Sequence, residues 1–258
     1  MTDQDSLLPA QIGVLPVALV TGSTSGIGAA IARRLSNDGY AVILHSKNSV
    51  EKGNAFASAL GTALYIQADL SQDAERIKLI QQAVAWRGRL DVLVNNAGIS
   101  HVIAHDDLMA ASATIWKELY EVNVVAPFRL IAEAESTLRQ TAHSHQQSTC
   151  VINISSHAGV RPKGASIPYA ASKAALNHMT RLLAVSLAPD IRVNAVAPGL
   201  VDTPLTAHWN LAQQLWQTRS PMQRSATPDD IAHIVAMLIS SHYLTGEIIL
   251  SDGGMNLT

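Results

Sequence analysis

The sequence predicts an α/β fold, a single domain in which helices cover both faces of a doubly wound parallel β-sheet. Short runs of Val, Ile and Leu alternate along the chain with longer segments in which apolar residues recur at helical spacing, a pattern typical of a parallel sheet buried on both sides. With 258 residues, of which 48% are hydrophobic, the chain is long enough for one large core. Neither an internal repeat nor a linker divides the sequence.

The amino-terminal half begins with a tail and then alternates strands and helices. Residues 1–16 contain Asp but no Lys or Arg, so we expect a flexible tail and not a secretory signal. Each expected strand is a short apolar run, and each expected helix follows it across a polar or glycine-containing turn. The expected strands are 17–20, 41–44, 64–66 and 90–94, and the expected helices are 27–38, 50–60, 73–86 and about 111–139.

The carboxy-terminal half continues this alternation within the same domain, residues 17–258. We expect an exposed polar loop at 143–148 and an amphipathic helix within 204–217 that could cover a bound substrate as a lid. The expected strands are 150–154, 191–196 and 247–250, and the expected helices are 169–187 and 228–240. In a sheet of this kind the ligand binds beyond the carboxyl ends of the strands.

Composition excludes several classes of partner. A net charge of −2 without a basic tract argues against nucleic acid or a membrane surface as the partner, and no apolar run approaches the roughly 20 residues that cross a bilayer. The single cysteine, Cys150, cannot form an internal disulfide, which is typical of the reducing cytoplasm. It lies in an apolar run, where we expect a buried, inert thiol. The histidines lack the spacing typical of a metal site.

A glycine-rich turn follows the first expected strand and opens the first expected helix. The segment reads Thr-Gly-Ser-Thr-Ser-Gly-Ile-Gly over residues 21–28. Gly22 can form the tight turn, Gly26 lets the backbone approach a ligand, and Gly28 lets helix and strand pack closely. The free N–H groups at the start of that helix suit a pyrophosphate, so we predict a Rossmann-like dinucleotide site. Its expected contacts here are Thr21, Gly22, Ser25, Gly26, Ile27 and Gly28.

The end of the second expected strand favours NADP(H) over NAD(H). An acidic residue about 20 positions after the glycines usually binds the ribose 2′-hydroxyl of NAD, but here the strand ends in Leu-His-Ser-Lys-Asn. Ser46 can donate a hydrogen bond to a 2′-phosphate and Lys47 supplies a positive charge, although Lys47 could also be an ordinary exposed lysine. Glu51 is expected in the first turn of the next helix, where the helix dipole favours it.

The most informative pair is Tyr169 and Lys173, four residues apart, with Ser156 thirteen residues before the tyrosine. That spacing is about one helical turn, so the phenol and the ammonium project from one helix face. We expect the ammonium to lower the pKa of Tyr169 by roughly 1–3 units. A phenol tuned in this way can exchange a proton with an alcohol or carbonyl oxygen.

In this order, the motifs at 21–28, 95–98, Ser156 and Tyr169-x-x-x-Lys173 resemble those of the short-chain dehydrogenase/reductase family over nearly the whole chain. The resemblance implies that Asn123 completes a catalytic tetrad with Ser156, Tyr169 and Lys173 by holding a water, although a buried amide could equally bond to the backbone. It further implies cofactor contacts from Asp69, Leu70, Asn96, Ala97, Gly98, Pro198, Gly199, Val201 and Thr203, together with Tyr169 and Lys173.

The resemblance implies an oxidoreductase that moves a hydride between nicotinamide and a carbonyl or secondary alcohol. A 3-oxoacyl carrier-protein reductase is the expected activity, on a small-molecule or carrier-bound acyl substrate, in a homotetramer or homodimer. Alternatives are an NAD(H)-dependent dehydrogenase of a sugar, steroid or other alcohol, and a non-catalytic cofactor sensor, which has no need of Tyr169. His101 and His157 lie beside the expected chemistry, either as substrate contacts or as merely exposed loop residues.

Overall fold

Seven parallel strands form one sheet with the order β3-β2-β1-β4-β5-β6-β7 in a computed structural model that describes residues 15–258. The strands are β1 Val17–Val20, β2 Ala41–Ser46, β3 Ala63–Gln67, β4 Val92–Asn95, β5 Thr149–Ile154, β6 Ile191–Pro198 and β7 Ile248–Ser251. Most of the expected amino-terminal tail, residues 1–14, lies outside the described residues. The predicted doubly wound parallel sheet is confirmed.

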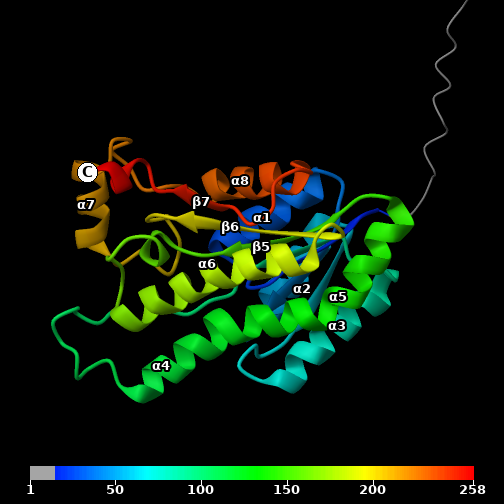
Figure 1. Cartoon of the computed structure of the whole chain (residues 1–258), viewed down its shortest axis with the longest axis horizontal. Coiled ribbons are helices and arrows are strands. Elements are labelled where there is room, and N and C mark those ends of the chain that lie inside the picture. The colour runs from blue at the N-terminus through cyan, green and yellow to red at the C-terminus, as the bar shows by residue number, and fades with distance from the viewer. Residues whose placement is uncertain (1–14) are drawn as a thin grey trace, which may run out of the picture.

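The sheet is buried because helices cover both of its faces (Figure 1). One face packs against α1 Gly26–Asn37, α2 Val50–Leu60 and α8 Pro228–Ser240, and the other packs against α3 Asp73–Arg87, α5 Ala126–His145 and α6 Ile167–Leu187. β1, β2, β4, β5 and β6 are buried along their whole length. This is why these strands are continuous apolar runs and do not alternate with polar residues.

The order of the strands reverses at β1, and this reversal creates the site. Val20, at the end of β1, pairs with Leu44 of β2 on one side and with Val94 of β4 on the other. The chain therefore leaves the sheet in opposite directions after β1 and β4, which opens a crevice at the carboxyl ends of the strands.

The long helical stretch expected at about 111–139 is present, from Ala113 to His145, but one of its turns is wider than an α-helical turn. It consists of α4 Ala113–Tyr120, a π-helical turn over Glu121–Val125, and α5. Wider turns of this kind interrupt helices mostly at functional sites, and this one contains Asn123.

The boundaries of two further segments also differ from expectation. The expected loop at 143–148 is helical as far as His145, and α5 ends where Gln146 takes a left-handed conformation with φ 51°. The expected lid helix begins later, as α7 Asn210–Arg219. It does so because Thr206 folds inward and bonds the segment before it, with its Oγ1 donating to the carbonyl of Val201 at 2.5 Å.

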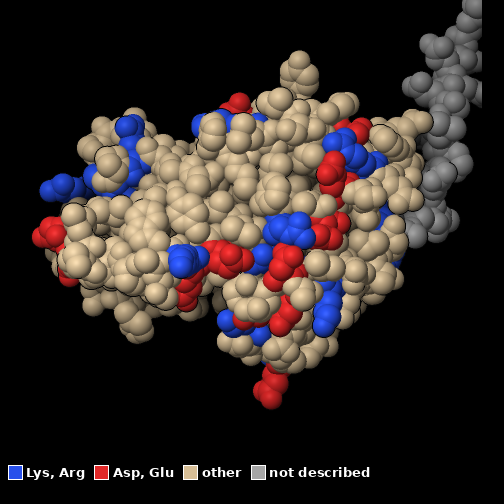
Figure 2. Space-filling view, turned by 60° about the horizontal axis from the view of Figure 1, so that its bottom comes forward, with Lys and Arg blue, Asp and Glu red and all other residues tan. Residues whose placement is uncertain are grey.

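Charged groups of both signs are mixed over the face shown in Figure 2, and neither sign forms an extended patch there. None of the helices in the described part of the chain combines the length and the apolar character that a bilayer crossing demands.

Candidate active site

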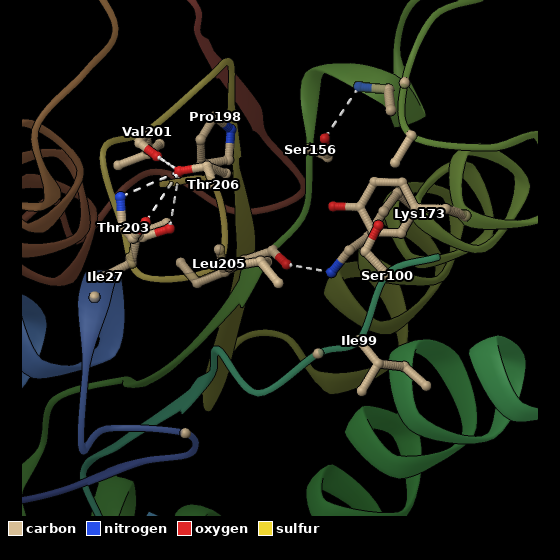
Figure 3. Close-up of a pocket in the computed structure, with 18 of the residues that line it drawn as sticks. Ile27, Ile99, Ser100, Ser156, Lys173, Pro198, Val201, Thr203, Leu205 and Thr206 are labelled. Carbon is tan, nitrogen blue, oxygen red and sulfur yellow. Dashed lines mark hydrogen bonds between the residues drawn. The ribbon is translucent and has the colours of Figure 1, made fainter. Parts of the chain in front are cut away.

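A cavity of about 1330 Å³ lies at the carboxyl ends of the strands. It is lined by Ser156, Tyr169, Lys173 and these expected cofactor contacts: Gly22, Ser25, Gly26, Ile27, Gly28, Ser46, Lys47, Asp69, Leu70, Asn96, Ala97, Gly98, Pro198, Gly199, Val201 and Thr203. Thr21 and Asn123 lie behind this lining and are buried. Segments far apart in the sequence thus meet in one cavity, part of which Figure 3 shows.

The glycine turn is packed so closely that side chains are excluded from it. A Cβ on Gly28 would lie 2.4 Å from the carbonyl oxygen of Gly22, and Gly22 itself has φ +63°, a conformation that favours glycine. Ser25 precedes α1 as its N-cap, but its side chain makes no capping hydrogen bond. The exposed start of α1 therefore offers N–H groups and a free hydroxyl to an anion, and this cradle fits the pyrophosphate of a dinucleotide.

Thr21 and Asn96 join the glycine turn to the end of β4. The Oγ1 of Thr21 accepts from the backbone N–H groups of Asn96 and Ala97, at 3.0 Å each. In return, the side-chain amide of Asn96 donates to the carbonyls of Thr21 and Gly22, at 2.8 and 3.1 Å. Both residues therefore shape the turn through hydrogen bonds to the backbone.

His45, which the sequence reasoning missed, supports the same turn from β2. Its Nδ1 accepts from the N–H of Gly22 at 3.1 Å, and its Nε2 lies 3.0 Å from the carbonyl oxygen of Ala68. Burial lowers the pKa of His45 to about 4, so the ring is neutral and can accept at one nitrogen and donate at the other. A histidine within an otherwise apolar strand next to the glycines was the available signal.

At the adenosine end of the cavity, Lys47 is exposed and pairs with Asp69, with Nζ 2.8 Å from Oδ2. Partial burial raises the pKa of Asp69, but hydrogen bonds from Lys47 and Ser71 outweigh it and hold that pKa at about 2. The Oγ of Ser46 lies 2.8 Å from the hydroxyl of Tyr65. The two residues expected to bind a 2′-phosphate thus line the cavity but already have protein partners.

The tyrosine and the lysine lie on successive turns at the start of α6. Ser166 caps this helix by accepting from the N–H of Tyr169 at 3.3 Å, which fixes Tyr169 in the first turn. Lys173 is 5% exposed, and its Nζ lies 5.9 Å from the centre of the Tyr169 ring. That Nζ donates to the carbonyl of Ile154 at 2.9 Å (Figure 3).

The expectation that Lys173 lowers the pKa of Tyr169 was wrong for this structure. Burial raises the pKa of Tyr169, and a hydrogen bond with Ser156 opposes that rise. The ammonium is directed to the carbonyl of Ile154 and not to the phenol oxygen. Burial also lowers the pKa of Lys173, to about 8, because no carboxylate within residues 15–258 compensates the loss of water.

Asn123 links the π-helical turn to the loop after β4. Its Oδ1 accepts from the N–H of Ile99 at 2.9 Å, and its Nδ2 donates to the carbonyl of Ile99 at 3.0 Å and to the Oγ of Ser172 at 3.1 Å. A Cβ on Gly98 would lie 3.1 Å from that Oδ1 and 3.4 Å from the Nζ of Lys173. The amide therefore bonds to the backbone, as the simpler alternative predicted, close to Lys173.

The segment after β6 forms the opposite wall. The Oγ1 of Thr206 accepts from the N–H of Thr203 at 3.2 Å while it donates to the carbonyl of Val201 (Figure 3). A Cβ on Gly26 would lie 3.2 Å from the Cγ2 of Thr203, so this segment faces the glycine turn. Thr206, another residue that the sequence reasoning missed, holds the segment in that position.

The structure gives little support to two other kinds of site, a nucleophilic cysteine and a metal centre. Burial raises the pKa of Cys150 to about 11, so the thiol stays protonated and is a poor nucleophile. Within residues 15–258, no cluster of three or more His, Cys, Asp or Glu side chains is arranged to hold a metal ion. His101 is partly exposed and lies 3.2 Å from Glu118, outside the cavity lining.

Comparison with known proteins identifies relatives along nearly the whole chain. A family model described as "Enoyl-(Acyl carrier protein) reductase" matches residues 22–256. The protein named as ketoacyl reductase 2 of the granaticin polyketide synthase, from Streptomyces violaceoruber, is 45% identical over 246 residues, which cover 94% of this chain and 96% of that protein.

Solved structures agree with these relatives. The 3-ketoacyl-(acyl-carrier-protein) reductase from Brucella melitensis, complexed with NADH, aligns with a TM-score of 0.86 at 29% identity, over 93% of this chain and 98% of that one. The RhlG/NADP active-site complex from Pseudomonas aeruginosa aligns with a TM-score of 0.86 at 34% identity, over 93% of this chain and 96% of that one.

Proposed function

Because the chain belongs to the short-chain dehydrogenase/reductase family and is similar to ketoacyl reductases within it, we propose that it is an NADPH-dependent ketoreductase. We propose that it acts on a 3-oxoacyl group, free as a thioester or bound to a carrier protein. The observation that carries this proposal is the meeting of Ser156, Tyr169 and Lys173 in one cavity with the glycine cradle.

The proposed reaction divides the work between the cofactor and three side chains. NADPH, when bound, supplies a hydride to the carbonyl carbon. Tyr169 gives its phenolic proton to the carbonyl oxygen, and the hydroxyl of Ser156 donates a hydrogen bond to the same oxygen as charge develops there. The raised pKa of Tyr169 suits the reduction of a carbonyl, because the phenol is then protonated at neutral pH and can donate that proton to the carbonyl oxygen.

Lys173 and Asn123 support the proton donor. We propose that the charge of Lys173, whose Nζ lies 5.9 Å from the centre of the Tyr169 ring, stabilises the tyrosinate that forms when the proton leaves, and that the same group binds the nicotinamide ribose. Asn123 fixes the loop after β4 beside Lys173 through its hydrogen bonds to Ile99. We retain the proposal that it also holds a water that returns a proton to Tyr169.

The preference for NADPH is supported by the charges at the end of β2. Residues 45–49 read His-Ser-Lys-Asn-Ser and include no carboxylate that would repel a 2′-phosphate. Lys47 lines the cavity and is exposed, so its ammonium can contact a phosphate while it remains paired with Asp69. The named structural relatives include one complex with NADH and one with NADP.

A cofactor assay over a panel of substrates tests this proposal. The absorbance of NADPH and, separately, of NADH is followed with 3-oxoacyl thioesters, diketones, sugars and steroids. We expect oxidation of NADPH by a 3-oxoacyl thioester, and a loss of that activity in Tyr169→Phe. Reduction restricted to the carbonyl groups of sugars or steroids would refute the 3-oxoacyl assignment, and a preference for NADH would refute the cofactor assignment.

We also propose that residues 17–258 act as one domain, in a homotetramer or homodimer in the cytoplasm. Support for self-association comes from apolar side chains exposed along α5, α6 and the preceding turn, namely Val125, Phe128, Ile167, Leu182 and Val185. Support for the reducing location is the single, buried Cys150. Light scattering on the wild type and on Val185→Asp tests the assembly, since a charge on this face should produce monomers.

A further inference from the structure

His157 lines the cavity beside the reacting groups, yet the proposed reaction gives it no task. It follows Ser156 directly and begins a short 3₁₀ turn, His157–Gly159. It is 5% exposed, contrary to the alternative of an exposed loop histidine. Its ring meets the edge of Trp216 from α7, with the ring centres 6.0 Å apart and the planes at 81°.

The ring nitrogens of His157 lack hydrogen bonds to the protein. Nε2 is fully enclosed and has no hydrogen-bond partner, although it lies 3.4 Å from the Oδ2 of Asp252. Nδ1 is not among the fully enclosed atoms, and within residues 15–258 no hydrogen bond joins it to the protein. The enclosed Nε2 thus has only the carboxylate of Asp252 near it, and Nδ1 is the nitrogen of this cavity-lining ring that a ligand can reach.

Asp252 fixes the side of the ring on which the proton resides. Its carboxylate accepts from the N–H of Gly254 at 3.0 Å and from the N–H of Asn256 at 2.8 Å, so its position is set by the backbone. Neutral imidazole carries one proton, and an adjacent carboxylate favours that proton on Nε2. Nδ1 is then left as a hydrogen-bond acceptor.

The charged groups around His157 are consistent with a neutral ring. Burial lowers the pKa of His157, the charge of Asp252 opposes this, and the charges of Lys163 and Arg161 lower it further. The ring therefore offers a lone pair, and not a second N–H, at neutral pH.

Apolar side chains line the cavity that His157 borders. Trp216, Leu205, Leu215 and Val102 line the same cavity. Another histidine in the lining, His105, is already engaged, because its Nε2 lies 3.1 Å from the carbonyl oxygen of Gly164. An acceptor in such a wall discriminates strongly, since a site built to bind a hydroxyl rejects the analogue that lacks it.

We propose that His157 is a specificity-determining residue that accepts a hydrogen bond from a hydroxyl group of the substrate, so that among the ketones it reduces, 3-oxoacyl groups included, the enzyme favours those that carry a hydroxyl near the reacting carbonyl. In the reverse direction the corresponding substrates are diols. The inference rests on the proposed ketoreductase function and adds a substrate class to it. Asp252 is a positioning residue in this arrangement, because it acts through the ring of His157.

A matched ligand series tests the proposal without requiring turnover. Cyclohexanone and its hydroxylated forms, 2-hydroxycyclohexanone, 3-hydroxycyclohexanone and 4-hydroxycyclohexanone, are titrated by calorimetry into Tyr169→Phe with NADPH present. We expect at least one hydroxyketone to bind about tenfold or more tightly than cyclohexanone. Adding His157→Phe should reduce that ratio to within about twofold, and His157→Gln, which keeps an acceptor, should retain part of it.

A control variant and two contrary results complete this test of His157. His145→Leu, at the exposed end of α5, should leave the ratio unchanged. Equal affinity across the whole series, or a preference that survives in both His157→Phe and His157→Leu, overturns the inference. Equal affinity in the parent protein suffices for this even if the His157 variants fail to fold.

The proposed function can fail separately. NADPH oxidation by the wild-type enzyme with the same four ketones and with a 3-oxoacyl thioester reports on that function alone. A retained binding ratio without any turnover would refute the ketoreductase and leave the acceptor role of His157 in place. Turnover of the plain and hydroxylated ketones at equal kcat/KM would support the ketoreductase and refute the acceptor role of His157.

Discussion

The two halves of the cavity are built differently. The cofactor half, around the glycine turn, is held by hydrogen bonds to the backbone from Thr21, His45 and Asn96, and it allows no added side-chain atoms at Gly28. The substrate half is bounded by side chains from α7, from the loop after β5 and from the carboxy-terminal segment.

The substrate half is also more exposed. α7 has no buried residues, and apolar side chains beside the opening are largely accessible to solvent, with Leu211 85% and Val102 70% exposed. Exposed apolar groups at a cavity mouth commonly mark a ligand or partner site. The difference teaches that close backbone packing defines the proposed cofactor site. The identity of the side chains around the other half of the cavity, by contrast, determines which substrates fit.

The largest expected effect separates chemistry from cofactor binding. Tyr169→Phe keeps the ring and removes the proton donor, so kcat should fall at least about 100-fold. The dissociation constant for NADPH, measured by fluorescence titration, should stay within about threefold, because the glycine cradle is untouched. Turnover near the wild-type level would remove Tyr169 from the mechanism, and a parallel loss of NADPH binding would show that the two halves are not independent.

A smaller effect is expected at the adenosine end. Lys47→Ala should raise KM for NADPH about tenfold, because a charge-assisted contact to the 2′-phosphate is lost. KM for NADH should change little, and Lys52→Ala, exposed on α2, should alter neither value. An equal loss for both cofactors would indicate that Lys47 acts through Asp69 and not through the phosphate.

The support of the glycine turn provides a third test. His45→Leu leaves the N–H of Gly22 and the carbonyl of Ala68 without their partner, which should cost about 1–3 kcal/mol of unfolding free energy. We expect NADPH affinity to fall about fivefold, while kcat at saturating cofactor is largely kept. Chemical denaturation measures the unfolding free energy, and fluorescence titration measures the NADPH affinity. His233→Leu, at an exposed position, is the control. Unchanged affinity would show that the turn holds without His45.

The smallest effect concerns the buried ammonium. The pKa of Lys173 is about 8 in the folded protein against an ordinary 10.5, so its charge destabilises the fold below pH 8, and this penalty is relieved as pH rises from 8 towards 10.5. Between pH 7 and pH 9 the wild type should gain about 1 kcal/mol of unfolding free energy relative to Lys173→Met.

Chemical denaturation without cofactor measures this difference. Lys78→Met, exposed on α3, is the matched control and should show no such trend with pH. A difference between wild type and Lys173→Met that stays constant from pH 7 to pH 9 would contradict a lowered pKa at Lys173.

Features set by local sequence could be predicted. The strands are apolar runs, the glycines mark the tight turn, and the four-residue spacing places Tyr169 and Lys173 on one helix. These depend on backbone geometry and burial, which neighbouring residues determine. The alternation of elements was sufficient for the parallel sheet.

Features set by contacts across the fold could not be predicted in the same way. The neighbour of His157, Asp252 after β7, lies on a segment that only folding brings close to it. The direction of the Tyr169 pKa shift depends on burial and on where the Lys173 ammonium points, and sequence spacing determines neither. The π-helical turn at Asn123 likewise depends on its bonds to Ile99.

The most direct test of the account is the position of the substrate oxygen in a crystal structure of the protein with NADPH and a bound ketone. We predict that this oxygen lies within about 2.6–3.2 Å of both the Tyr169 and the Ser156 hydroxyl oxygens, with the pyrophosphate against residues 22–28. A ketone oxygen that contacts neither hydroxyl in a complete ternary complex would contradict the proposed proton transfer.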